Sequence, residues 1–161
     1  MGIDPGLTRT GFAVVEGPDG ALRCLAAGTV ATPTDAPTPE RLLFLKEALG
    51  EVVTFWGPEE VAVERVFYNQ NVRTAVSVIQ ASGVALVAAA GLGCRVHEYT
   101  PLEVKQAVVG TGTATKRQVS YMVRRLVTMG GGVDTPDAAD ALAVAICHLH
   151  ARRLRILGAR T

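Results

Sequence analysis

The chain has 161 residues, of which 48% are hydrophobic and 19% are charged, so it can form one domain with a substantial core. Its three cysteines show no Cys-x-x-Cys spacing, which argues against a disulfide framework or a cysteine metal site and favours reduced thiols in the cytoplasm. The net charge is +1, but residues 1–94 carry ten acids against six Lys and Arg, whereas residues 95–161 carry five acids against ten. We therefore expect a polyanion to bind the C-terminal half, unless the basic residues of 152–161 only form a flexible tail.

The first part of the sequence predicts three consecutive strands. A very short strand ends at Asp4, directly before the turn residues Pro5-Gly6. A second strand over residues 12–16 is joined by a Gly-Pro-Asp-Gly turn to a third over residues 22–31. We expect an antiparallel meander in which the first acid lies on a central strand.

Two helices and a strand are predicted next. Thr38-Pro39-Glu40 caps a helix that ends at Gly57-Pro58, and a strand then ends at Glu64. Residues 75–94 are apolar enough to raise the question of a membrane span, but their Ser, Gln and Gly content favours a largely buried amphipathic helix that could also pack against a partner helix. The predicted apolar stripe of the first helix is Leu42, Leu45, Leu49, Val52 and Trp56, and that of the second is Val72, Val76, Ile79, Gly83, Leu86 and Ala90.

The C-terminal half predicts one more strand and three helices. After a strand over residues 94–99, Thr100 and Thr115 each begin a capping box, and Thr135 caps a last helix with Pro136 at its first position. Antiparallel strands followed by alternating helices and strands predict an α/β fold, with a five-stranded mixed sheet flanked by helices on both faces.

Four carboxylates, Asp4, Glu64, Asp137 and Asp140, lie at ends of these predicted elements. Each has an ordinary alternative explanation, as a turn residue or as an acid that complements the helix dipole. Together they form an oxygen-only ligand set, which Mg²⁺ prefers, and the chain shows no zinc-type spacing of His or Cys. The set therefore favours metal-dependent chemistry on phosphates.

Several specific segments follow one another in order along almost the whole chain. They are Gly2-Ile3-Asp4-Pro5-Gly6 with Thr8 and Gly11, Glu64-Arg65-Val66-Phe67, Val104-Lys105-Gln106-Ala107-Val108-Val109-Gly110, Lys116-x-Gln118, and Asp137-Ala138-Ala139-Asp140-Ala141-Leu142-Ala143 continuing to Cys147-His148. Together these segments resemble the RuvC family of Holliday-junction resolvases, members of the ribonuclease H-like superfamily. Relatives usually carry a few more apolar residues before the first segment, where only Met1 stands here, so the first strand is expected to begin short.

The resemblance implies a homodimeric endonuclease that resolves four-way DNA junctions in recombination and repair. Each subunit would cut one of two like-polarity strands, leaving 5′-phosphate and 3′-hydroxyl ends, and a RuvA-RuvB branch-migration complex would be a partner. Asp4, Glu64, Asp137 and Asp140 would be the catalytic metal ligands, binding two Mg²⁺ ions with Mn²⁺ as a substitute. Some relatives have His in place of Asp137, whereas the all-acid set stands here.

Five residues are candidate DNA contacts: Phe67, Tyr68, Lys105, Lys116 and Arg117. Phe67 and Tyr68 follow Glu64 and could stack on an unpaired base; the alternative is that Phe67 is a core residue and only Tyr68 is exposed. Lys105 and Lys116 match basic positions that the family uses against the DNA backbone, but on sequence alone they are also ordinary solvated helix residues.

Two other functions remain open at this point. Asp4-x-Gly6-x-Thr8-x-x-Gly11 also resembles the phosphate loop of the sugar kinase, actin and Hsp70 ATPases, but those proteins need two such domains and 161 residues provide one. A DNA-binding module without catalysis is the other alternative, and the presence of all four acids argues against it.

Overall fold

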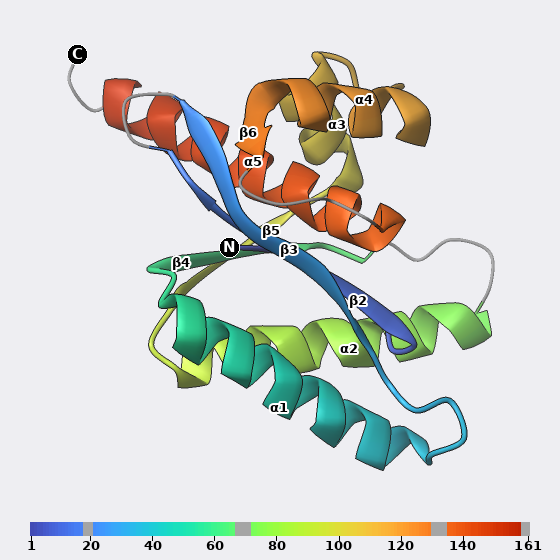
Figure 1. The fold of residues 1–161 in the computed structure, drawn as a ribbon. Coiled ribbons are helices and arrows are strands. Elements are labelled where there is room, and N and C mark those ends of the chain that lie inside the picture. Colours follow the sequence, from blue (N-terminus) through green and yellow to red (C-terminus); the bar gives the residue numbers. More distant parts are fainter. Residues whose placement is uncertain (18–20, 67–71, 130–134, 159–161) are drawn as a thin grey trace.

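The computed structural model describes residues 1–17, 21–66, 72–129 and 135–158, and it contains a mixed sheet with helices on both faces (Figure 1). The strands are β1 (Gly2–Asp4), β2 (Arg9–Glu16), β3 (Leu22–Ala31), β4 (Glu60–Glu64), β5 (Arg95–Tyr99) and β6 (Val127–Met129). The helices are α1 (Thr38–Trp56), α2 (Val72–Gly91), α3 (Pro101–Val109), α4 (Lys116–Leu126) and α5 (Pro136–Gly158).

The strands are ordered β5-β4-β1-β2-β3-β6. The predicted meander is confirmed, since β1 and β2 and then β2 and β3 pair antiparallel, and β1 lies centrally, parallel to β4. The predicted count of five strands is wrong, because Val127–Met129 adds a sixth that pairs parallel with β3. This strand has three residues and follows α4 directly, with Val127 already extended at φ −124°, so no turn residue marks it in the sequence.

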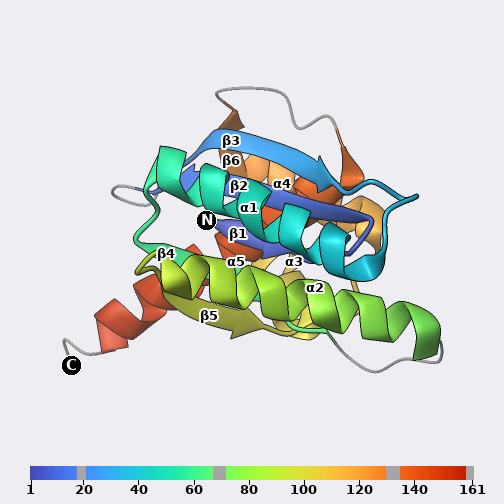
Figure 2. The ribbon, with the colours of Figure 1, turned by 90° about the horizontal axis from the view of Figure 1, so that it is seen from below.

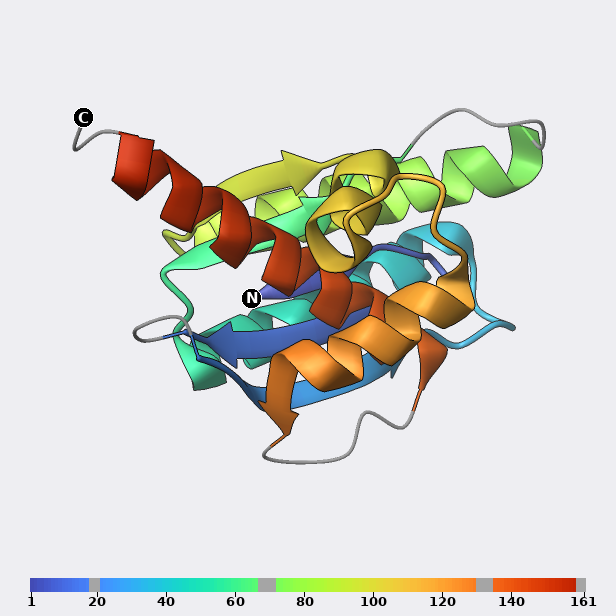
Figure 3. The same ribbon diagram turned by 90° about the horizontal axis from the view of Figure 1, so that it is seen from above.

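Helices α1 and α2 cover one face of the sheet (Figure 2), and α3, α4 and α5 cover the other (Figure 3). Two glycines let α5 lie directly on the central strands. A Cβ atom at Gly2 would overlap the carbonyl oxygen of Ala141, and one at Gly11 would lie 2.5 Å from the carbonyl carbon of Asp137. The backbone of β1 and β2 therefore determines where the first turns of α5 lie.

The buried face of α2 is not the predicted one. Val76 and Ile79 of the predicted stripe are 48% and 47% exposed, and Val87 is 63% exposed. The buried positions are instead mostly alanines: Ala75, Ala81, Ala85, Ala88 and Ala89. Small side chains allow α2 to approach α1 and the sheet closely, so the larger apolar side chains are left on the outer face.

Several helix ends differ from the prediction. Pro37, not Thr38, occupies the N-cap of α1 and provides no side-chain cap, whereas the capping boxes at Thr100 and Thr115 are confirmed. Helix α5 continues to Gly158, so residues 152–158 are helical rather than part of a flexible tail. Among the helices of the described ranges, none combines the length and apolar character that a membrane span requires.

Candidate active site

Asp4 and Glu64 lie side by side at one edge of the sheet. Strands β1 and β4 are parallel, and Ile3 pairs in register with Val63, so the next residue of each strand is one of these acids. The carboxyl ends of parallel strands meet at the same sheet edge, which explains why residues 60 positions apart become neighbours. A side-chain hydrogen bond joins the two carboxyl groups.

The start of α5 brings the other two acids to this edge. The backbone N–H of Ala138 donates to Thr135 Oγ1 at 3.2 Å, which confirms the predicted N-cap. The Thr135 hydroxyl also lies 2.7 Å from that of Thr29 on β3, so the cap is tied to the sheet. With Gly11 beneath the first turn, Asp137 and Asp140 are held near the end of β1.

Three of the four carboxylates interact electrostatically. Burial, and then the negative charges of Glu64 and Asp140, raise the pKa of Asp4 to about 8. Burial and the charge of Asp140 also raise the pKa of Glu64. Like charges so close together in a partly buried site favour either a shared proton or a bound cation. Asp4, Glu64 and Asp140 therefore form a centre, called the acidic centre below, in which a bound cation would reduce the repulsion between the carboxylates.

Asp137 has a different neighbour in this structure. Its Oδ2 accepts a hydrogen bond from Arg9 Nε at 2.6 Å, and the Arg9 side chain comes from the start of β2. Sequence reasoning did not single out Arg9, because 128 residues separate it from Asp137 and no spacing connects them.

Basic side chains line the rim of the acidic centre. Lys116 Nζ lies 3.1 Å from Asp140 Oδ2, and this carboxylate raises the pKa of Lys116. The charge of Lys105 acts on Glu64 from α3. Beside Asp140, a cleft of about 280 Å³ is lined by Lys116 and by Arg124, which the sequence did not suggest.

The other candidate DNA contacts are less directly connected to the carboxylates. Arg117 is exposed on α4 and lines a different, shallow pocket with Tyr121 and Met122. Phe67 and Tyr68 lie outside the described residues.

A second polar cluster lies at the opposite end of β4. Glu60, His97 and His148 have ligand atoms that all lie within 4.8 Å of one another. The sequence showed no such group, because its members are 37 and 51 residues apart and come from two strands and a helix.

The sequence and the fold of this chain match those of known nucleases. The family model described as crossover junction endodeoxyribonuclease RuvC matches residues 1–148. The chain is 46% identical over 154 residues to a Syntrophomonas wolfei protein of that name, covering 96% of this chain and 90% of the relative. It is 48% identical over 150 residues to one from Chloroflexus aurantiacus, covering 93% and 92%.

Among solved structures, Thermus thermophilus RuvC in complex with a Holliday junction substrate superposes with a TM-score of 0.87 at 37% identity, covering 95% of this chain and 93% of that one. The yeast mitochondrial Holliday junction resolvase Ydc2 is 10% identical with a TM-score of 0.71, a likeness of fold alone. The predicted ribonuclease H-like α/β class is thus confirmed, and the chain belongs to the crossover junction endodeoxyribonuclease RuvC family.

Proposed function

We propose that this chain is a structure-selective endonuclease that resolves four-way DNA junctions in homologous recombination and repair. Residues 1–161 would form one catalytic domain that hydrolyses phosphodiesters to 5′-phosphate and 3′-hydroxyl ends and acts in the cytoplasm. The observation that carries the proposal is the convergence of Asp4, Glu64 and Asp140 from β1, β4 and α5, with Lys116 at their rim, in a chain of this family.

The donor set of the centre fits a hard divalent cation. Asp4, Glu64, Asp137 and Asp140 offer only carboxylate oxygens, and burial together with neighbouring carboxylate charge raises the pKa of both Asp4 and Glu64, a charge that a bound cation would offset. We infer that the four hold two Mg²⁺ ions, with Mn²⁺ as a substitute. Mg²⁺ bound by these oxygens supplies activation of a water molecule and stabilisation of the leaving oxygen.

Basic residues around the centre would position the scissile strand. Lys116 and Lys105 act on the carboxylates from α4 and α3, and Arg124 lines the adjoining cleft, so a DNA phosphate at this rim would contact several cations at once. Arg117, which lines a different pocket on α4 from Lys116, would contact the DNA backbone away from the acidic centre. For Phe67 and Tyr68 the proposal is stacking on an unpaired base at the junction centre.

Two symmetric cuts require two sites, and we propose a homodimer formed through α2. Val76, Ile79 and Val87 make the outer face of this helix apolar, at 48%, 47% and 63% exposure. An identical face on a second copy would bury these side chains in a self-complementary contact. A RuvA-RuvB branch-migration complex would present the junction to this dimer.

Synthetic four-way junctions test the activity. With Mg²⁺, the protein should introduce two symmetric nicks, and EDTA should stop cleavage without stopping binding. Asp4→Asn, Glu64→Gln, Asp137→Asn and Asp140→Asn should each nearly abolish cleavage and retain binding, because each removes a metal ligand without adding bulk. Loss of binding together with cleavage would indicate a folding role for these acids. Tight ATP binding without cleavage would reject the nuclease assignment.

A further inference from the structure

Glu60, His97 and His148 form a compact cluster where the start of β4, the middle of β5 and helix α5 meet. His148 Nε2 lies 2.6 Å from Glu60 Oε2, and His97 Nε2 lies 3.4 Å from the same oxygen. The two imidazole rings are 4.6 Å apart between centroids. The side chains of Glu60 and His148 are only 12% and 5% exposed. One oxygen and two nitrogens therefore converge in a mostly buried place.

His97 is the unusual member of this cluster. Its Nε2 atom is buried, and within the described residues it makes no hydrogen bond, although it lies 3.4 Å from the Glu60 carboxylate. A buried polar atom without a hydrogen bond destabilises the folded state. A ligand that satisfies this atom would remove the destabilisation.

We propose that Glu60, His97 and His148 bind a transition-metal dication, with Zn²⁺ as the best fit, at a site separate from the acidic centre. Two imidazoles and one carboxylate are a known zinc ligand set, whereas Mg²⁺ prefers oxygen ligands alone. Glu60 and Glu64 stand four residues apart on β4, or about 13 Å. His148 and Asp140 stand eight residues apart on α5, or about 12 Å.

Two of the three pairs of ligand atoms need only a small adjustment, and all three atoms lie within 4.8 Å of one another. Zn²⁺ with ligands at about 2.0–2.1 Å in tetrahedral geometry separates neighbouring ligand atoms by about 3.3 Å. The pair formed by His97 Nε2 and Glu60 Oε2 already has this spacing, at 3.4 Å. The pair formed by His148 Nε2 and Glu60 Oε2 must open from 2.6 Å, because a metal would replace the hydrogen bond that joins them.

Surrounding side chains hold the ligands in place. Tyr99 Oη lies 2.9 Å from His148 Nδ1, so it can accept a hydrogen bond from the Nδ1–H group when Nε2 serves as a ligand. Arg95 Nη2 lies 2.6 Å and Arg152 Nε 3.7 Å from Glu60 Oε1, which leaves Oε2 for the metal. Because these arginines offset the charge of Glu60, most of the affinity must come from the two imidazoles, and this again favours Zn²⁺ over Mg²⁺.

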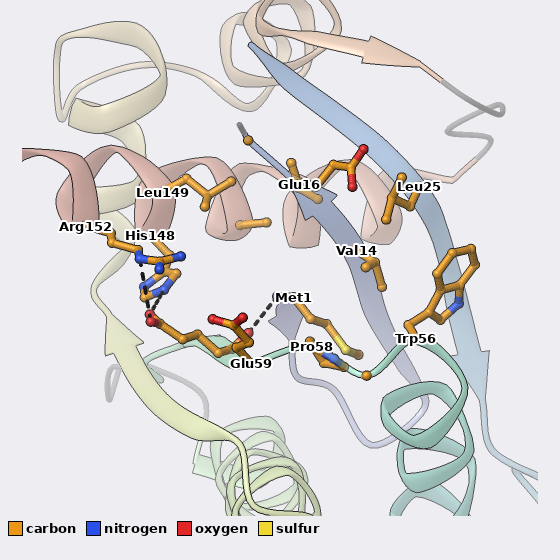
Figure 4. Close-up of a pocket in the computed structure, with 15 residues that line it drawn as sticks. Met1, Val14, Glu16, Leu25, Trp56, Pro58, Glu59, His148, Leu149 and Arg152 are labelled. Atoms are coloured by element: carbon orange, nitrogen blue, oxygen red, sulfur yellow. Dashed lines mark hydrogen bonds and ion pairs between the residues drawn. The ribbon is translucent and has the colours of Figure 1, made fainter. Parts of the chain in front are cut away.

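A solvent route reaches this cluster. Glu60, His148 and Arg152 line a pocket of about 510 Å³ that also includes Glu16 and Trp56. Figure 4 shows the His148 and Arg152 side chains pointing from α5 into this pocket. A water molecule from the pocket would complete a four-coordinate site.

Metal binding here would stabilise the position of α5. Glu60 belongs to β4, His97 to β5 and His148 to α5, so the ion would cross-link the helix that carries Asp137 and Asp140 to the strand that carries Glu64. A ligand that binds only the folded state raises the unfolding free energy in proportion to the logarithm of its concentration over its Kd.

The test is direct metal binding by the full chain after chelation and desalting. Zn²⁺ content would be measured by mass spectrometry, and Co²⁺ would serve as an optical probe of tetrahedral coordination. The wild type should bind one Zn²⁺ per chain at this site, and Zn²⁺ should raise its Tm. His97→Gln should weaken binding at least about tenfold and abolish the Tm increase. Because His97 Nε2 makes no hydrogen bond to any residue that the structure describes, this variant should still fold.

Two controls make the outcome specific. The chain has three histidines, and His150 is the one outside the cluster. Its Nδ1 lies 3.1 Å from the carbonyl oxygen of Ala107. His150→Gln should therefore bind Zn²⁺ as the wild type does. The double variant D4N/D140N should also retain Zn²⁺, since the two sites are separate. Zn²⁺ binding that disappears in D4N/D140N, or that survives when His97→Gln is added to this double variant, overturns the proposal. Absence of stoichiometric Zn²⁺ binding by the wild type overturns it as well, leaving a hydrogen-bonded network only.

Discussion

Replacing Gly11 with alanine is expected to displace the start of α5. The added Cβ atom would lie 2.5 Å from the carbonyl carbon of Asp137 and 3.3 Å from the Ala138 nitrogen. An ordinary carbon contact is about 3.5–4.0 Å, so the first turn of α5 must move by about 1 Å. Such overpacking typically costs about 1–3 kcal/mol of unfolding free energy. A displacement of about 1 Å in a catalytic group can lower the rate by about 100-fold.

The assay combines urea unfolding with junction cleavage by the same preparation. Gly50→Ala is the matched control, because Gly50 lies within α1 and its added Cβ would approach only Leu92 Cδ1, at 4.0 Å. This control should cleave normally and gain about 0.5–1 kcal/mol from better helix propensity. If Gly11→Ala cleaves at the wild-type rate and unfolds within about 0.5 kcal/mol of the wild type, the contact between β2 and α5 does not position Asp137.

Three other changes test the electrostatics and the surfaces. In EDTA, Asp4→Asn should be more stable than the wild type by about 5 kcal/mol at pH 8 and about equal near pH 4. The pKa of Asp4 is about 8 in the folded state and lower in the unfolded state, so the unfolding free energy of the wild type falls as the pH rises from 4 to 8. Urea unfolding that gives the same difference between variant and wild type at both pH values would contradict this. Lys116→Ala should weaken junction binding across sequences and reduce its salt dependence by about one unit of slope, and an unchanged slope would exclude a phosphate contact. Val87→Glu on α2 should shift the protein from dimer to monomer in analytical ultracentrifugation. Leu43→Glu on α1 is the control, because Leu43 is an exposed apolar residue of another helix, at 54%, and this variant should remain a dimer. A Val87→Glu protein that remains a dimer would place the interface elsewhere.

Local signals in the sequence predicted most of the fold. The meander, the two capping boxes and the Thr135 cap depend on residues within a few positions of one another, so they could be recognised from the chain alone. The ends of β1 and β4 and the start of α5 were recognised in the same way, and these ends carry the four acids.

What the sequence did not predict depends on contacts between distant elements. Hydropathy placed Val76 and Ile79 inside, but close packing of α2 selected alanines such as Ala81 and Ala85 for its buried face. The absence of zinc-type spacing in the sequence also did not exclude a His-containing cluster, because β5 and α5 bring His97 next to His148. In both cases tertiary packing, rather than local spacing, determines which side chains meet.

The charges of the acidic centre are offset in three different ways. Asp137 pairs with Arg9, Asp140 pairs with Lys116, and Asp4 shares a proton with Glu64. Divalent cations held by these four carboxylates would offset the same negative charge in place of Arg9, Lys116 and the shared proton. Lys116 Nζ, at the rim of the centre, would then be available to contact a DNA phosphate. The lysine that offsets the charge of Asp140 would thus also serve to hold the substrate.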